Sequence, residues 1–317
     1  MLGNSRSRLL PLSVVCAAVL IGCASPREEP RPAADADQRP EVYVVNYPLQ
    51  YFARRIGGDH VNVVFPAPPD EDPAFWQPDE QTILAYQNAD LVLLNGAGYA
   101  HWVQHVSLPP SRLVDTSQTF RDEYIVLEDR VVHQHGPAGE HVHEGYAFTT
   151  WIDPHQAIQQ AEAIAQAFAY EWPDRADAFQ ANWEALEVDL RALDARLTEV
   201  NAGYQGQPLL ASHPVYDYLA RRCEWDLKSV HWEPDEMPGE EEWRELEQLL
   251  EQHPARWMIW EDEPLEQTAQ RLAALGVGSV VFAPAENTPD EGDYLQVMYQ
   301  NLQNLEAVFD SPEGTSS

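Results

Sequence analysis

The sequence predicts an α/β fold in which two lobes, each built on a parallel sheet, are joined by a long rigid helix. Short β-rich runs alternate with helical stretches over residues 41–172, and the same alternation returns over residues 204–312. Between them, residues 173–203 carry one continuous apolar stripe of helical period. Strands that alternate with helices favour parallel sheets covered on both faces.

In the first lobe, residues 41–172, the helical stretches carry their own start and stop signals. Two glycines close the first helix, and Asp153-Pro154 supplies a cap and first turn for the last one. The expected strands are residues 42–46, 61–65 and 90–95. The expected helices are residues 49–56, 79–88 and 154–170.

The connecting helix, residues 173–203, is predicted by apolar residues spaced alternately by four and three. They are Phe179, Trp183, Leu186, Leu190, Leu193, Leu197 and Val200. A helix of this length would reach roughly 40 Å at about 1.5 Å per residue. A coiled-coil dimer is the alternative interpretation, but about four heptads beside α/β lobes favour packing within the chain.

The second lobe, residues 204–312, repeats the alternation of strands and helices. The expected strands are residues 209–212, 257–260 and 277–282. The expected helices are residues 215–222, 240–252, 265–275 and 294–309.

The start of the chain resembles the export signal of a bacterial lipoprotein. Arg6 and Arg8 precede an apolar stretch that is too short to span a bilayer and that ends in Leu20-Ile21-Gly22-Cys23. The resemblance implies that residues 1–22 are removed and that lipid is attached to the thiol of Cys23. Residues 23–40, rich in Pro, Ala and charge, are expected to form a flexible tether. The expected location is therefore the periplasm, anchored to a membrane by lipid; a buried N-terminal helix ending in Cys is the alternative.

Acidic residues dominate the charge, with 52 Asp and Glu against 19 Lys and Arg. This argues against a nucleic-acid partner, because phosphate binding needs a basic face. The excess fits exposure to high external salt, and it is no evidence of a specific metal site. Once Cys16 leaves and Cys23 is acylated, Cys223 stands alone, so no intramolecular disulfide is expected.

Five stretches, in order along the chain, resemble the zinc and manganese solute-binding proteins of ABC transporters. They are Asn46-Tyr-Pro48 with Ile56-Gly-Gly-Asp59, Asp90 to Gly96 with Trp102, Trp151-Ile-Asp-Pro154, Ser212 to Tyr218, and Gly292 to Leu302. The resemblance implies a metal-type periplasmic binding protein that holds a divalent ion in a cleft between its lobes. It also implies a permease partner, to which the ion is delivered.

The ligand positions of that family are mostly altered. The family binds its metal with four ligands, and by direct transfer Ala74 and Thr149 stand at the first two. The third is retained as His213. The fourth is an acid just after the last strand, where residues 282–285 contain none. One imidazole does not make a tight metal site.

Two His-x-His pairs, His133 with His135 and His141 with His143, form a replacement set on a Gly-rich loop. Alternate side chains of an extended segment point the same way, so both pairs can aim at one ion. We expect this loop to complete the primary site around His213. A weak metal collector and a pH-sensitive loop are the alternatives.

His231 and Glu233 are the next candidate ligands, since they follow a presumed strand of the second lobe. Core packing or a surface pair are the alternatives for them. The remaining histidines are expected at the surface: His60, His101, His105, His155 and His253.

The expected cargo is Zn²⁺, because sites rich in His and free of sulfur favour zinc, copper or nickel, whereas manganese prefers more carboxylate. Mn²⁺, Ni²⁺ and Cu²⁺ remain alternatives. So do a metallochaperone, a binding protein for a metal chelate, and an adhesin-like lipoprotein that has lost binding. The sequence carries no HExxH, GxSxG or phosphate-binding Gly loop, so an enzyme is not expected.

Overall fold

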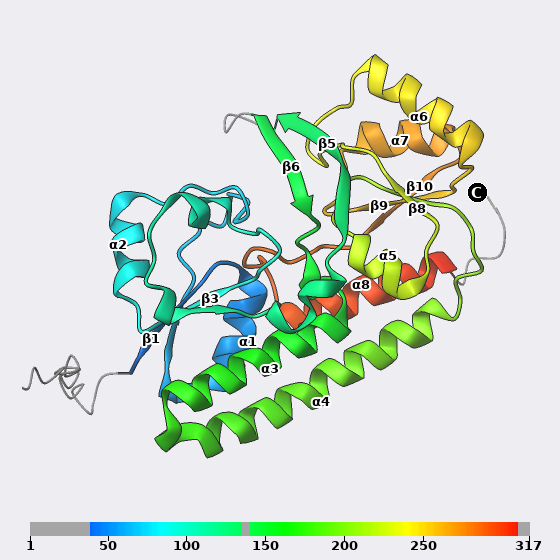
Figure 1. Ribbon diagram of the computed structural model, residues 1–317. Helices are drawn as coiled ribbons and strands as arrows, with labels where there is room; N and C mark the ends of the chain where they lie inside the picture. Colours follow the sequence, from blue (N-terminus) through cyan, green and yellow to red (C-terminus); the bar gives the residue numbers. More distant parts are fainter. Residues whose placement is uncertain (1–38, 135–139, 310–317) are drawn as a thin grey trace, which may run out of the picture. The chain divides into compact units, whose positions relative to one another are not determined.

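The computed structural model describes residues 39–134 and 140–309, with side chains described outside residues 128–144. Two four-stranded parallel sheets dominate it, with strand orders β2-β1-β3-β4 and β10-β9-β7-β8 (Figure 1). The predicted α/β class with two parallel sheets is confirmed. We call each sheet with its own helices a lobe. The predicted signal peptide, Cys23 and tether residues 23–38 lie outside the described residues.

The first lobe contains the strands β1 (Glu41–Val44), β2 (Asn62–Val64), β3 (Leu91–Leu94) and β4 (Leu113–Asp115). Its helices are α1 (Tyr47–Gly57) and α2 (Glu80–Asn88). Asn46 caps α1, because its Oδ1 accepts from the Leu49 N–H at 3.1 Å. Asp79 caps α2 in the same way through Thr82, at 2.7 Å. The expectation missed β4, whose three residues are too few to show a period of two.

The second lobe contains the strands β7 (Leu209–Ala211), β8 (Leu227–Ser229), β9 (Trp257–Trp260) and β10 (Gly278–Val281). Its helices are α5 (Asp217–Cys223), α6 (Glu240–Gln252), α7 (Glu266–Ala274) and α8 (Tyr294–Phe309). Every strand pair in this sheet is parallel, so all four carboxyl ends meet at one edge.

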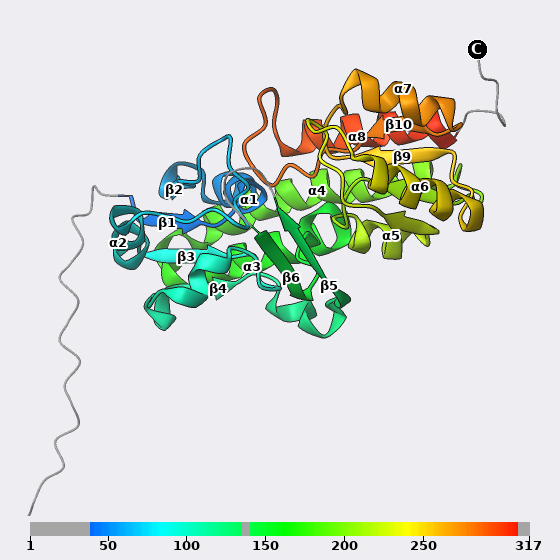
Figure 2. The same ribbon diagram turned by 90° about the horizontal axis from the view of Figure 1, so that it is seen from above.

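Two long helices lie between the lobes in the sequence, α3 (Pro154–Glu171) and α4 (Ala176–Asn201), and they pack side by side (Figure 2). All seven residues of the predicted apolar stripe are buried on α4, so the helix is confirmed. The stripe joins one hydrophobic cluster with α1, α3, α8 and residues of both sheets. Packing within the chain therefore accounts for the stripe.

Residues 126–146 form an antiparallel pair, β5 (Val126–Gln134) with β6 (Glu140–Tyr146), where the sequence analysis expected a loop. We call this pair the hairpin. In β6, the run His141-Val142-His143 shows the period of two of a strand, whereas β5 carries Val131-Val132-His133-Gln134 and shows it less clearly. The 3-10 helices are η1 (Gly58–His60), η2 (His101–His105), η3 (Pro110–Arg112), η4 (Gln118–Glu123), η6 (Thr150–Ile152) and η7 (Pro173–Arg175).

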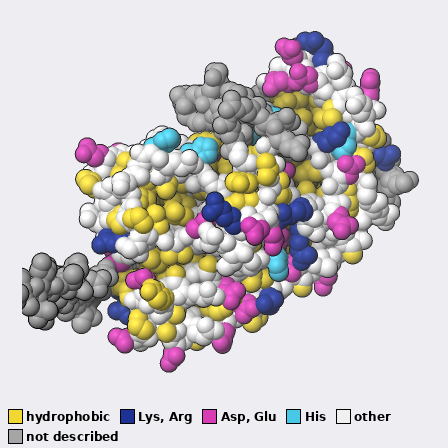
Figure 3. Space-filling view, in the orientation of Figure 1, with side chains coloured by type: hydrophobic (Ala, Val, Ile, Leu, Met, Phe, Trp, Pro, Cys, Tyr) yellow, Lys and Arg dark blue, Asp and Glu magenta, His cyan; other side chains and the backbone are white. Residues whose placement is uncertain are grey.

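Acidic side chains lie at many separate places on the face shown in Figure 3, so on this face the acidic excess is not one patch. Among the described residues, no helix is both long enough and apolar enough to cross a bilayer.

Candidate metal-binding site

Each strand of the second lobe is followed by a histidine or an acidic residue. His213 follows β7, His231 and Glu233 follow β8, Glu261 follows β9, and Glu286 follows β10. Because the four strands are parallel, these residues leave the sheet at the same edge. The sheet topology therefore gathers titratable side chains from four separate parts of the sequence.

The buried imidazole of His213 lies between two carboxylates. Its Nδ1 is 2.8 Å from Glu261 Oε1, and its Nε2 is 3.2 Å from Glu233 Oε1. Burial alone would lower the pKa of His213, but bonding to Glu233 and Glu261 outweighs burial and raises the pKa to about 10. The ring of His231 meets that of His213 edge-on, with centroids 6.1 Å apart. His213 is thus in contact with a carboxylate at each ring nitrogen, an arrangement that favours its protonated form.

The segment that carries His231 and Glu233 is anchored by the tryptophan between them. The Trp232 N–H donates to the Ser212 carbonyl at 3.0 Å, which ties the segment to the end of β7. Its buried ring packs on Trp243 with centroids 4.6 Å apart. Alternate residues of an extended segment point to opposite sides, so with Trp232 in the core its two neighbours face the other way.

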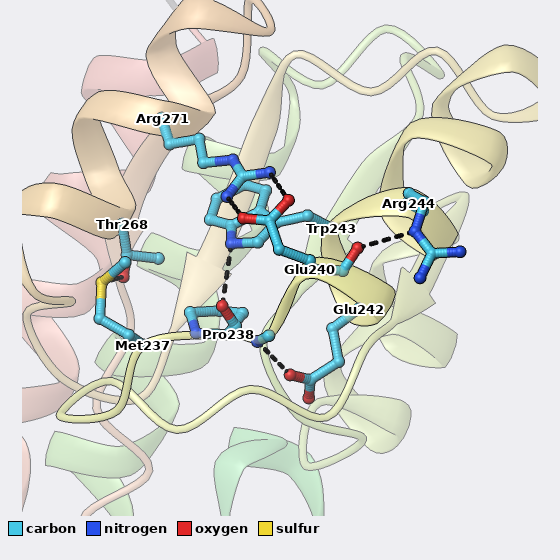
Figure 4. A network of polar contacts seen from close by, with 9 residues as sticks. Met237, Pro238, Glu240, Glu242, Trp243, Arg244, Thr268 and Arg271 are labelled. Atoms are coloured by element: carbon cyan, nitrogen blue, oxygen red, sulfur yellow. Dashed lines mark hydrogen bonds and ion pairs between the residues drawn. The ribbon is translucent and has the colours of Figure 1, made fainter.

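Trp243 is held in turn by a polar network at the start of α6 (Figure 4). Its indole N–H donates to the Pro238 carbonyl at 3.1 Å, and the Arg271 guanidinium lies 4.3 Å from its ring centroid. Arg271 also bonds Glu240 at 2.7 Å. This network joins α6 to α7 and supports the segment after β8.

Glu286, which was not among the predicted ligands, follows directly on residues 282–285, where an acid was expected and none stands. Its carboxylate oxygen Oε2 is buried. Burial, together with the charges of Glu261 and Asp72, raises the pKa of Glu286 to about 8. Glu261 was also missed. A buried acid therefore does follow the last strand of the second lobe, one residue beyond the predicted stretch.

Asp72 is the acid that the first lobe brings to this edge, and the segment before it is tied to Glu286's segment by one side-chain amide. Asn287 Nδ2 donates to the carbonyls of Pro68 and Glu71, at 2.6 and 2.9 Å. The Tyr47 N–H donates to the Glu286 carbonyl at 3.0 Å. These bonds hold the two lobes together at the candidate site.

Two positions that are ligands in the resembling family have other roles here. Ala74 is fully buried, and its carbonyl accepts from the His101 N–H at 3.0 Å. The Thr149 hydroxyl donates to the Val215 carbonyl. Neither position offers an imidazole.

The structure places three hairpin histidines through backbone pairing alone: His133 lies opposite His141, and His143 lies opposite Val131. His135 lies outside the described residues. At the base of the hairpin, the Tyr218 hydroxyl donates to the Ala147 carbonyl at 2.7 Å. Tyr218 belongs to α5, shortly after His213, so the hairpin base is attached beside His213's segment.

Of the predicted ligands, the structure therefore brings together His213, His231 and Glu233. Within the described residues, no group of three or more His, Cys, Asp and Glu side chains is arranged to hold a metal ion. The geometry of His213 explains this, since its two carboxylate partners approach opposite ring nitrogens and do not converge on one point.

The expectation that His253 lies at the surface is wrong. The side chain is 4% exposed, and its Nε2 lies 2.9 Å from the Leu209 carbonyl. Its place at the end of α6, over the start of β7, explains the burial, which its polar sequence neighbours do not reveal.

Two parallel sheets bridged by packed helices, with acids and histidines at the strand ends, define the scaffold of a metal-type solute-binding protein. Residues 42–308 match the family described as zinc-uptake complex component A, periplasmic (ZnuA), and the chain belongs to this family. It is a family of transport components rather than of enzymes. The family resemblance predicted from the sequence is confirmed.

Two relatives show how far the likeness extends. The zinc-binding lipoprotein AdcA of Streptococcus pneumoniae serotype 4 is 24% identical over 314 residues, covering 95% of this chain and 60% of AdcA. The chain thus spans about 60% of the length of that relative. The high-affinity zinc uptake system protein ZnuA of Bacillus subtilis is 23% identical, covering 93% of this chain and 95% of that protein.

Solved structures share the fold. The Zn(II)-bound ZnuA-like domain of Streptococcus pneumoniae AdcA matches with a TM-score of 0.72 and 19% identity, covering 86% of this chain and 100% of the domain. The metal-dependent lipoprotein YcdH of Bacillus subtilis matches with a TM-score of 0.70 and 21% identity, covering 85% of this chain and 98% of YcdH.

Proposed function

We propose that this protein is the extracytoplasmic binding component of an ABC importer, which captures Zn²⁺ and delivers it to a permease. The observation that carries the proposal is the buried imidazole of His213 between two carboxylates, at the edge where all four strands of the second lobe end. Membership of the zinc-uptake family and the names of the relatives support zinc as the cargo.

We assign His213 and Glu286 as ligands, with His231 and the carboxylate of Glu233 as further donors. Zn²⁺ needs a neutral imidazole, so the ion would replace the proton that His213 shares with its acids. The carboxylate on the other ring nitrogen would keep its bond. Such a carboxylate orients a metal-binding histidine and raises its basicity.

The hairpin remains our proposed source of the missing imidazoles, through His133, His135, His141 and His143. The acids at the strand ends alone would favour manganese, because carboxylates suit harder ions. Imidazoles from the hairpin would move the preference toward zinc. The attachment of the hairpin base to α5 supports this arrangement.

Calorimetric titration of the purified, metal-stripped protein with Zn²⁺, Mn²⁺, Ni²⁺ and Cu²⁺ tests the proposal. We expect one Zn²⁺ to bind most tightly. His213→Ala should weaken it on the order of 100-fold, because about 10–16 kcal/mol of zinc binding is shared among about four ligands. Replacing the four hairpin histidines with Asn should cost a similar factor.

The exposed His105 gives a matched control, and His105→Ala should bind Zn²⁺ as the parent protein does. Tight zinc binding that survives His213→Ala would overturn the assignment of the site. Survival in the hairpin variant would restrict the ligands to the strand ends.

Lipid anchoring at Cys23 is part of the same proposal, and the printed name of AdcA as a lipoprotein supports it. In a bacterial host, Cys23→Ser should move the protein from the membrane fraction to the soluble fraction. Cys223→Ser, which alters a buried thiol, should leave the fractionation unchanged.

A further inference from the structure

Tyr99 is a buried phenol whose hydroxyl has no hydrogen-bond partner within the described residues. Its ring packs on Phe148 and Trp151, with centroids 5.3 and 5.4 Å away. Buried tyrosine hydroxyls ordinarily find a partner. Tyr86, for example, donates to the Val44 carbonyl at 2.8 Å. The hydroxyl of Tyr99 therefore needs an explanation beyond packing.

The loop after β3 holds Tyr99 in place through an unusual backbone. Two non-glycine residues, Ala97 and Ala100, adopt φ of 51° and 56°, in the left-handed region that L-residues disfavour. Gly96, at φ 80°, has no room for a Cβ, which would meet Ser117 Oγ. Strained backbone of this kind is often found where a side chain must be held for function.

Hydrogen bonds link the surroundings of Tyr99 to both acid-bearing segments. The N–H of His101, two residues on, donates to the Ala74 carbonyl in the segment of Asp72. The indole N–H of Trp151, on which the Tyr99 ring packs, donates to the Pro284 carbonyl at 2.7 Å, two residues before Glu286. Tyr99 is thus bracketed by the segments that carry Asp72 and Glu286.

Glu286 is the acceptor that best suits this phenol. Its Oε2 is a buried carboxylate oxygen with no hydrogen-bond partner among the described residues, whereas Asp72 is exposed and water can hydrogen-bond its carboxylate. A phenol is protonated at neutral pH and can donate this hydrogen bond.

We propose that Tyr99 is a positioning residue of the metal site, whose hydroxyl donates a hydrogen bond to the Glu286 carboxylate when Zn²⁺ is bound. This bond orients the second carboxylate oxygen toward the ion. A hydrogen bond to an ionised carboxylate is strong in a buried site. The proposal rests on the proposed zinc-binding function.

Tyr99→Phe removes the hydroxyl and keeps the ring. We expect the variant to bind Zn²⁺ on the order of tenfold more weakly, as is usual when a group that orients a ligand is lost. Its metal-free form should unfold at the same temperature as the parent or higher, because an unpaired buried hydroxyl is gone. Tyr86→Phe is the control, and it should lower stability while leaving zinc affinity unchanged.

A double-mutant cycle with Glu286→Gln separates positioning from packing. If Tyr99 acts through Glu286, Tyr99→Phe will cost little affinity in the Glu286→Gln background. Unchanged affinity of Tyr99→Phe, or an equal loss in both backgrounds, overturns the inference for Tyr99 alone. Absence of zinc binding by the parent protein instead overturns the proposed function.

Discussion

The two lobes contribute unequally to the candidate site. The second lobe brings His213, His231 and three glutamates to one edge of its sheet, from four different strand ends. The first lobe brings Asp72 and the phenol of Tyr99, while Ala74 and Thr149 occupy the family's ligand positions. The difference shows that one lobe can keep its candidate metal-ligating side chains while the other lobe lacks an imidazole at the family's ligand positions. We infer that the second lobe and the hairpin bind the ion and that the first sheet and its helices cover it.

The largest loss of zinc affinity is expected from a substitution in the second lobe. Glu286→Gln should weaken Zn²⁺ binding on the order of 100-fold, because a charged ligand becomes a neutral amide. Asp72→Asn, the matched change in the first lobe, should cost less than about tenfold, because Asp72 is exposed. Competition titrations measure both, and a larger loss from Asp72→Asn would contradict the assignment.

The protons held by the second lobe predict a pH dependence of stability. The pKa of Glu286 is raised from 4.5 to about 8, and that of His213 from 6.5 to about 10. The folded state therefore binds more protons than the unfolded state between these values. Stabilisation is full below the unfolded pKa of each group and is lost as pH rises through its folded pKa.

Urea unfolding of the metal-free protein at several pH values checks this expectation. Stability should fall from about pH 5 to about pH 10 as these two groups lose their protons, and Glu286→Gln should flatten the part below about pH 8. Zinc should reverse the trend, because binding displaces the same protons. A metal-free stability that rises across this range would refute the cation between two acids.

Asn287 carries two of the hydrogen bonds that hold the lobes together, and its replacement tests what they contribute. Asn287→Ala removes two hydrogen bonds to the first lobe, and zinc should dissociate on the order of tenfold faster, since such bonds contribute about 1 kcal/mol each. Stopped-flow release to a chelator measures the rate. Thr288→Ala, at the exposed neighbouring residue, should release zinc at the parent rate.

The smallest effect is expected far from the ion. Arg271→Lys keeps the charge but loses the planar contact with Trp243 and the paired bonds to Glu240. Calorimetric scanning should show a small fall in unfolding temperature, with zinc affinity unchanged. A clear loss of zinc affinity would contradict this expectation. It would mean that Trp232 alone does not hold the segment after β8 in place.

The sequence predicted most helices and strands because their signals are local. The apolar stripe of α4 and the cap residue Asp79 each act within a few residues of the structure they specify. The observed bounds of α6, β9 and α8 match the expected ones. The strand β4 was harder because three residues are too few to show a period of two. The hairpin was harder because Gly and Pro between the His pairs suggested a loop.

The site was predicted less completely because its members meet only through topology. His213 was found through its matched neighbours, and His231 with Glu233 through their place after a strand. Nothing local distinguishes Glu261 and Glu286 from the many acids around them, because the contact of Glu261 with His213 and the burial of Glu286 both arise from the fold. The surroundings of the Tyr99 side chain likewise come from residues distant in sequence, such as Phe148 and Trp151.

The apolar stripe of α4 also limits the motions by which the protein can release a bound ion. Its seven apolar residues share one continuous core with strands of both sheets, including Val42, Leu209 and Ile259. A wide hinge motion would expose this core to water, at a cost of about 25 cal/mol per Å² of apolar surface. Release should therefore proceed by local loosening of the loops that carry Asp72 and Glu286, with the packed helices and sheets left as they are.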